Sequence, residues 1–316
     1  MIIRRATSSD TPQIVDLLRS SLGEGSTEKS LGYWNWKHVA NPFGSSPVLI
    51  AEIDGVVAGV RAFMQWKWQF GGKTYRALRA VDTATHPDYR GKGIFKQLTL
   101  QLVKECREEG FDFIFNTPND QSRPGYLKMG WQQIGKLPVR LRLCQPIRLL
   151  KNALFPAPDG RRSLPEGDNA IHLPEDELGW IAEVSASEER FWRTDLSINF
   201  LRWRYQQCPV RQYSLVAEPS DYLIFYYFRH HRLGVELRVV EYLVRPGKEA
   251  AASCALQRIL QETSPDVVTI APSQRINTFF LPPLPIGLNL TFRRLTLTET
   301  PDIAMWNFSL GDFELF

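Results

Sequence analysis

Cysteine is scarce in this chain of 316 residues, and its spacing excludes two kinds of architecture. The four cysteines, Cys106, Cys144, Cys208 and Cys254, each lie at least 38 residues from the next. No pair has the C-x-x-C spacing of zinc sites and redox motifs, and so wide a spacing does not outline a disulfide framework. We therefore expect isolated, reduced thiols and no metal site.

Long apolar runs and a strong excess of one charge are also missing. No run of 18 apolar residues occurs, and the opening MIIRRATSSDTPQIV has no apolar core of signal-peptide length, which predicts a cytoplasmic protein without a membrane partner. The 38 basic and 34 acidic side chains give a net charge of +4 and a pI near 8.8. This mild excess suits a phosphorylated ligand but falls short of a nucleic-acid-binding composition.

What the sequence does contain is the strand and helix patterning of an α/β protein. Apolar runs on either side of Asp54-Gly55 predict a β-hairpin, and a further turn at 71–73 leads into another strand. Apolar residues at helical spacing from Ile94 to Cys106 predict a helix that ends at Gly110. The segment FDFIFNTP then reads as a short buried strand. This alternation predicts a mixed sheet flanked by helices.

Residues 144–189 differ from the rest, because they are rich in proline, glycine and charge and show no sustained periodicity. After them the chain repeats four segments of its beginning in the same order. The pairs are WKHVANP (36–42) with WRYQQCP (203–209), LIAE (49–52) with LVAE (215–218), LRAVD (78–82) with LRVVE (237–241), and FDFIFNTPND (111–120) with PDVVTIAPSQ (265–274).

This order predicts a duplicated domain, with two unrelated α/β halves as the alternative. The predicted division is a first half at 1–143, a linker at 144–189 and a second half at 190–316. A length of 316 residues and an apolar content of 43% are enough for two such domains.

The stretch HPDYRGKGIFKQL, from His86, carries the clearest chemical signal. Glycine disfavours helix formation and neighbouring cations repel, so local stability does not explain a glycine-rich basic turn before a helix. The first N–H groups of a helix lack partners and carry the positive end of its dipole, and glycine lets an oxyanion come close to them. We therefore interpret the turn as a cradle for a pyrophosphate. The chain has no Walker A sequence and no complete G-x-G-x-x-G, which disfavours nucleotide hydrolysis and dinucleotide binding.

Here the sequence resembles the GNAT superfamily of acyl-CoA-dependent N-acyltransferases. The family signature has Gln or Arg, two variable residues, Gly, a variable residue, and Gly or Ala. This chain has Arg90, Gly91, Lys92, Gly93, Ile94 and Phe95, and departs from the signature at Phe95. The resemblance implies that these six residues bind the pyrophosphate of coenzyme A. It also implies that the preceding strand is splayed from its neighbour, so that backbone groups of Thr83, Ala84 and Thr85 can bond the pantetheine arm.

The stretch NDQSRPGYLKMGW resembles a second family pattern, in which Asn119 and Tyr126 stand seven residues apart. The resemblance implies that Asn119 contacts coenzyme A and that Tyr126 lies near its sulfur as general acid. This role agrees with chemistry, because the thiolate that leaves when an amine attacks a thioester needs a proton.

The acid on the strand before the cradle is Asp82, which we expect to be a general base or a substrate ligand. Period-two alternation turns it to the wrong face unless a bulge intervenes, and a water chain to solvent is the rival route for the acceptor proton.

Two further features carry weaker expectations. His230 and His231 are adjacent in a strand and should point to opposite faces, which disfavours a metal site. The ending SLGDFELF, with Asp312 and Phe316, is expected to be an exposed tail, although the resemblance also includes two-domain relatives whose terminus approaches the active site.

Together these features predict two GNAT-like α/β domains in tandem. The first would bind acetyl-CoA and pass its acetyl group by direct attack to a primary amine of a small substrate. The second half has RPGKEAAASC where the first has the cradle, so we expect a degenerate copy that kept the scaffold and lost the site. One alternative is a Fem-type aminoacyl or peptidyl transferase that uses charged tRNA, and the other is a non-catalytic acyl-CoA sensor. No metal or nucleic acid is expected, and neither the acceptor nor the oligomeric state is specified.

Overall fold

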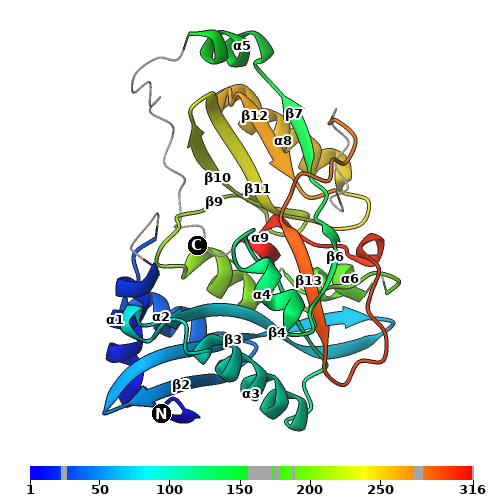
Figure 1. Cartoon of the computed structure of the whole chain (residues 1–316). Helices are drawn as coiled ribbons and strands as arrows, with labels where there is room; N and C mark the ends of the chain where they lie inside the picture. Colours follow the sequence, from blue (N-terminus) through cyan, green and yellow to red (C-terminus); the bar gives the residue numbers. More distant parts are fainter. Residues whose placement is uncertain (23–26, 156–172, 174–177, 187–188, 273–279, 315–316) are drawn as a thin grey trace.

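The chain builds two β-sheets that lie one above the other (Figure 1). The computed structural model describes residues 1–22, 27–155, 173, 178–186, 189–272 and 280–314. The first sheet has the order β1-β2-β3-β4-β5-β13-β6, with β8 paired to β3, and the second has the order β7-β12-β11-β10-β9. These mixed sheets with flanking helices confirm the predicted fold class.

The strand bounds are as follows. The first sheet contains β1 (Ile2–Arg5), β2 (Val48–Ile53), β3 (Val56–Phe70), β4 (Lys73–Thr85), β5 (Phe113–Asn116), β13 (Asn289–Arg294), β6 (Gln132–Lys136) and β8 (Arg193–Thr194). The second contains β7 (Arg140–Leu143), β12 (Val267–Ile270), β11 (Gly234–Val244), β10 (Tyr222–His231) and β9 (Ser214–Glu218). The hairpin predicted at Asp54-Gly55 joins β2 to β3.

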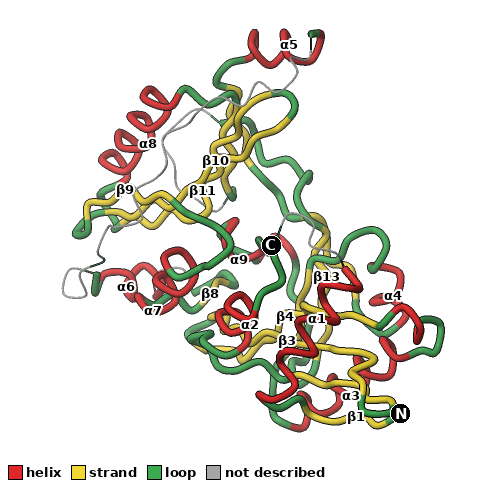
Figure 2. Tube along the Cα trace, turned by 90° about the vertical axis from the view of Figure 1, so that its left-hand side faces the viewer, coloured by secondary structure: helices red, strands yellow, loops and turns green. Residues whose placement is uncertain are grey.

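Helices cover both faces of the first sheet and the outer face of the second (Figure 2). They are α1 (Thr11–Leu22), α2 (Leu31–His38), α3 (Ile94–Glu108), α4 (Arg123–Lys128), α5 (Pro146–Leu154), α6 (Trp180–Ala186), α7 (Ile198–Leu201), α8 (Glu249–Thr263) and α9 (Leu310–Phe313). Because neighbouring side chains of a strand point to opposite faces, Ile50 packs in the core with α1 and Leu49 in the core with α3. On the second sheet Leu237 and Val239 pack with α8.

Each sheet is completed by a strand from the other half of the chain. β13, from the second half, lies between β5 and β6 of the first sheet and is antiparallel to both. β7, from the first half, is antiparallel to β12 at the edge of the second sheet. A cut at residue 143 therefore does not separate the two sheets, and the boundaries predicted at 143 and 190 remain predictions.

Two tryptophans from the repeated segments meet between the halves. The rings of Trp36 and Trp203 stack at 4.7 Å between centroids. The indole N–H of each donates to the backbone carbonyl of the other, at 2.7 Å in both directions. Both belong to one apolar core, which also takes in Trp66 of β3 and Phe225 of β10. The halves thus share a core, and the reciprocal bonds satisfy two buried indole donors.

The second half follows the order of the first. A hairpin is followed by a long helix and a short parallel strand, as β10–β11–α8–β12 and as β3–β4–α3–β5. In the alignment of the repeats, 113–116 correspond to 267–270, which are the observed bounds of β5 and β12. α3 and α8 both have 15 residues.

The predictions about cysteines and membrane spans can be compared with the described residues only. All four cysteines lie in this part of the chain, and none is disulfide-bonded. None of its helices is both long and apolar enough to span a bilayer. The cytoplasmic location stays a prediction. Most of the linker expected at 144–189 falls outside the described residues, apart from α5 and α6.

We predict that residues 1–143 will not fold stably when expressed alone. The fragment lacks β13, so β5 and β6 lose the strand that joins them and their backbone groups lose their partners. Thermal unfolding followed by circular dichroism should show no cooperative transition for the fragment and a restored one on co-expression with 144–316. A cooperative transition at the full chain's temperature would show that the exchanged strand is dispensable.

Candidate active site

The first sheet opens at its centre, where β4 and β5 diverge. The two strands pair in parallel only between Ala77–Arg79 and Phe113–Phe115. Beyond this point β5 ends at Asn116, while β4 continues to Thr85 and stays paired with β3. The predicted segment 83–85 lies on this continuation. No strand of the described residues pairs there with its edge that faces away from β3, so a bound chain could use backbone groups of that edge.

The glycine turn stands at the end of this opening, directly before α3. Gly91 and Gly93 have φ values of 78° and 75°, a left-handed conformation that favours glycine, and Gly93 caps the helix that begins at Ile94. A Cβ at Gly91 would meet no atom within 4 Å, so the space beside the turn is open. The Lys92 ammonium lies 4.8 Å from the centre of the Tyr89 ring. The turn can therefore present helix N–H groups and positive charge to an anion.

The other four predicted residues around the cradle take different positions. The Arg90 guanidinium donates to the carbonyl of Ser21 at 3.4 Å. Ile94 is buried in the core, and the ring of Phe95 meets that of Tyr126 edge to face at 5.9 Å. The Oδ1 atom of Asn119 accepts from the Ser122 N–H at 2.9 Å, which holds the chain ahead of α4.

Tyr126 is buried in α4 and borders a large cleft. Its ring packs against Phe95 and, at 5.2 Å, against Trp131. Arg61 of β3 lies on its other side, with the guanidinium carbon 5.3 Å from the ring centre. Arg61 is fully buried, and its nitrogens have no hydrogen-bond partner among the described residues. Arg61 was not predicted as a site residue, because nothing in its local sequence pattern distinguishes it from a surface residue of a strand.

Asp82 occupies a β-bulge. The register between β3 and β4 pairs Arg61 with Thr83 and Ala62 with Val81, so Asp82 is the extra residue, with a φ of 32°. The bulge interrupts the regular alternation of side chains between the two faces of β4. This is the condition under which Asp82 was expected to face the site.

The carboxylate of Asp82 is held by two donors from the end of α2. Its Oδ2 atom lies 2.8 Å from Lys37 Nζ and 2.7 Å from His38 Nε2. Burial opposes ionisation of this carboxyl, but the Lys37 ammonium and the His38 hydrogen bond outweigh it and lower the pKa of Asp82 well below its usual range. Burial lowers the pKa of His38, which is therefore the neutral partner, with Ser46 Oγ 2.9 Å from its Nδ1 atom.

The cleft beside Tyr126 and Asp82 has a volume of about 1010 Å³ and is lined by both halves. The first half contributes the diverging part of β4, the end of β5 and the start of α4. The second half contributes the face of its sheet opposite α8, with Tyr227 and Arg229 of β10 and Arg238 of β11. Such a junction between two layers is a common place for a substrate site.

The end of the chain is not the exposed tail that we expected. α9 is buried, and Asp312 Oδ1 accepts from Thr194 Oγ1 at 2.6 Å. The Arg79 guanidinium donates to the carbonyls of Asp312 and Phe313, so α9 is fixed beside the cleft, which Glu314 also lines. The tail was mispredicted because its four-residue helix is stabilised by these distant partners. Phe316 lies outside the described residues.

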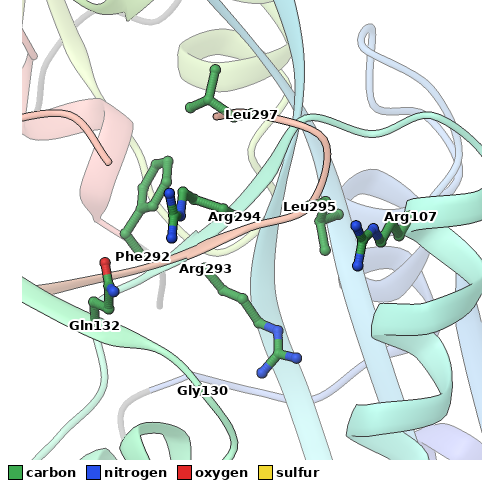
Figure 3. A pocket seen from close by; sticks show the side chains of 8 residues that line it. All are labelled: Arg107, Gly130, Gln132, Phe292, Arg293, Arg294, Leu295 and Leu297. Carbon is green, nitrogen blue, oxygen red and sulfur yellow. The ribbon is translucent and has the colours of Figure 1, made fainter. Parts of the chain in front are cut away.

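Two other features contribute no site residues. A smaller hollow of about 330 Å³ on the outer side of β13 is bordered by Arg107, Arg293 and Arg294 (Figure 3). In the part of the chain that the structure describes, no group of three His, Cys, Asp or Glu side chains is placed to hold a metal ion. His231 instead contacts Glu236, at 2.6 Å.

Known proteins match the first half by sequence and the whole chain by fold. Residues 2–134 match the family described as acetyltransferase (GNAT) domain. This first half is a GNAT domain. Its resemblance to the superfamily, predicted from the glycine turn and the Asn119–Tyr126 stretch, is thereby confirmed.

Two curated bacterial relatives each match about a fifth of this chain. An L-amino acid N-acyltransferase of Escherichia coli K12 is 35% identical over 71 residues, which are 22% of this chain and 40% of that protein. An L-methionine sulfoximine/L-methionine sulfone acetyltransferase of Salmonella typhimurium LT2 is 38% identical over 64 residues, 20% of this chain and 36% of that protein. The chain thus spans about two fifths of the length of each.

A solved structure from Enterococcus faecalis V583, described as a probable N-acyltransferase, resembles the whole chain. The match covers 94% of this chain and 73% of the Enterococcus chain, with a TM-score of 0.65 and 12% sequence identity. At this identity the likeness concerns the fold, which includes the second sheet as well as the GNAT domain.

Replacing Asp82 by Asn should destabilise the fold by about 3–5 kcal/mol, because it leaves the Lys37 ammonium buried without a counter-charge. Urea unfolding measures this loss. Since the pKa of Asp82 is lowered, the wild-type advantage is full above the ordinary carboxyl pKa of about 4 and shrinks as the pH falls below it.

Two variants control this prediction. Asp88→Asn, an exposed carboxyl in the next loop, should change stability by no more than about 0.5 kcal/mol. Adding Lys37→Met to Asp82→Asn should recover most of the loss, because both charges are then gone. An Asp82→Asn protein as stable as the wild type would contradict a tight buried pair.

Replacing Gly93 by Val should weaken the binding of coenzyme A at least tenfold, because a side chain there obstructs the turn and its left-handed backbone. Gly55→Val is the matched control, since Gly55 has a φ of 79° in the distant β2–β3 hairpin. Both variants should lose stability on the order of 1–2 kcal/mol, but only the first should lose affinity by calorimetry. A folded Gly93→Val protein with unchanged affinity would remove the turn from the binding site.

Proposed function

We propose that the chain transfers an acetyl group from coenzyme A to a primary amine of a small substrate, by direct attack of the amine on the thioester. The observation that carries this proposal is the continuity of the site. Thr83 on the open edge of β4 and Tyr126 line the same cleft between the sheets, and the glycine turn leads directly into α3, whose Phe95 packs on Tyr126. The relative named as an L-amino acid N-acyltransferase supports a small amine as acceptor.

The residues of the GNAT domain fit coenzyme A. The open space at Gly91 admits a phosphate next to the N–H groups of α3, with the charges of Arg90 and Lys92 nearby. Within the segment Thr83, Ala84 and Thr85, the backbone groups that face away from β3 offer donors and acceptors to an amide-bearing arm along β4, and Asn119 lies across the opening at the end of β5. When bound, coenzyme A supplies the activated acyl group as its thioester.

Tyr126 acts as the general acid in this mechanism. The nitrogen of the acceptor forms a bond to the thioester carbon, the carbon–sulfur bond breaks, and the phenol of Tyr126 gives its proton to the sulfur. The acceptor nitrogen loses one proton, which returns through solvent to the phenolate. Holding amine and thioester together is itself worth ~7–11 kcal/mol at best, so no covalent intermediate on the protein is needed.

Of the two roles expected for Asp82, we propose the substrate ligand rather than the general base. A carboxylate that already accepts from Lys37 and His38, and whose pKa is lowered, takes up a proton poorly. It can still orient an acceptor ammonium at the wall of the cleft. Water in the open cleft would then carry the acceptor proton to solvent.

We also propose that the second half is a decayed duplicate of the GNAT domain. Its strands follow the same order, and Trp36 and Trp203 from matching segments bond to each other reciprocally. Its long helix α8 begins at Glu249, whose charge opposes that of a phosphate, where the first half has the glycine turn. The copy would serve as the far wall of the acceptor cleft.

Tyr126→Phe should lower kcat by about 10²-fold or more while leaving the dissociation constant of acetyl-CoA nearly unchanged, because only the proton donor is lost. Tyr75→Phe is the control, because Tyr75 packs on Trp192 and does not border the cleft. Thiol release measures turnover, and calorimetry measures binding. An equal kcat would exclude Tyr126 as the acid. Tight binding of acetyl-CoA without thiol release for any amine would favour an acyl-CoA sensor. Turnover that occurs only with charged tRNA would favour a Fem-type transferase.

A further inference from the structure

The cleft between the sheets carries an excess of positive charge. Among the described residues that line it, six side chains are basic and three are acidic, a net charge of +3. The basic ones are Lys29, Lys37, Arg79, Arg211, Arg229 and Arg238, and the acidic ones are Asp82, Glu236 and Glu314. A cleft with a net positive charge attracts anionic ligands and repels cationic ones.

The three carboxylates are already engaged within the protein. Asp82 holds Lys37 and His38, as described above. Glu236 Oε1 lies 2.7 Å from Arg238 Nη1, and Glu314 Oε1 lies 2.5 Å from Nη2 of the same arginine. Glu236 also accepts from Thr269. A substrate with several positive charges would therefore meet paired carboxylates and additional cations.

The excess charge lies on both walls of the cleft. On the first wall, Lys29 lines the cleft together with Lys37 and Asp82, and its ammonium lies 5.6 Å from the centre of the Tyr33 ring. On the second wall, Arg229 follows Tyr227 by two residues in β10, so both side chains share the cleft face. The Arg211 guanidinium lies 4.8 Å from the centre of the Tyr227 ring.

We propose that the acceptor amine carries a carboxylate, and that Lys29 and the arginine wall of the second half, Arg211 and Arg229, bind it. This proposal rests on the proposed acetyl transfer and names its substrate class. It favours amino acids and other acidic amines over polyamines and aminoglycosides, whose added charges the cleft repels. Arginine suits this task because its planar fork matches a carboxylate.

The test compares each of several amino acids with its own α-carboxamide and with spermidine. The amine of the amide is less basic and is more often free at neutral pH, so amine basicity cannot produce a preference for the acid. We expect kcat/KM with acetyl-CoA to be at least tenfold higher for the acid than for the amide, and the ratio to shrink as salt is added.

Variants locate the carboxylate. If the carboxylate of the substrate lies near the acceptor amine, Lys29→Met should bring the acid-to-amide ratio close to one. If the carboxylate lies far from the amine, Arg229→Gln should do so instead. Arg107→Gln is the matched control, since it removes one positive charge at the separate hollow of Figure 3 and should leave the ratio unchanged. Amides or spermidine as the better substrates would overturn the proposal, and so would a full preference retained in both cleft variants.

A second readout separates this proposal from the proposed function. Protection against thermal unfolding by the acid, but not by the amide, needs no acyl-CoA and no turnover. Protection that is lost in Arg229→Gln or Lys29→Met, without any acetyl transfer, would support the carboxylate site and contradict the transferase. Acetyl transfer without any preference for acids would support the transferase and contradict the carboxylate site.

Discussion

The exchange of β7 and β13 is the constraint on which the rest of the molecule depends. Each sheet is completed by a strand of the other half, so neither sheet forms fully without both. Trp36 and Trp203 form a further contact between these halves, with stacked rings and two indole hydrogen bonds inside the shared core. The two halves of the chain therefore cannot separate without breaking ladder hydrogen bonds, and the shared core packs the two sheets against each other beside the cleft.

The residues of the site come from distant parts of the chain. Asp82 reaches the cleft through a bulge, and its charge is balanced by the end of α2 rather than by its own strand. α9 is held against the cleft by Arg79 of β4. A buried ion pair such as Lys37–Asp82 adds little net stability, but losing one partner is costly, so the pair fixes where α2 stands relative to the bulge.

Much of the fold was predictable from local pattern. Asp54-Gly55 specified a hairpin by its turn chemistry, and the helical spacing of apolar residues after Gly93 specified α3. The alignment of the repeats placed β12 correctly, because Asp and Pro flank both short strands in register. These features depend on neighbours in sequence. The glycine turn and Tyr126 were likewise predicted as site residues because their patterns are contiguous.

The rest depends on contacts between distant residues, which no single local pattern encodes. Residues 140–143 and 289–294 form strands whose local sequence does not specify which sheet they join. Lys37 and His38 stand more than 40 residues from Asp82, and the buried Arg61 looks like any charged residue of a strand. The position of α9 was missed for the same reason.

We propose that one half of the chain binds coenzyme A while the other forms the wall of the acceptor cleft. The most direct measurement is a calorimetric titration of the full chain with coenzyme A. We expect one equivalent per chain, because the second half has the single Gly247 before its long helix where the first half has Gly91 and Gly93, and its helix begins at Glu249, whose charge opposes that of a phosphate. Two equivalents would contradict the decay of the second half, and no binding at all would contradict the proposed acyl donor.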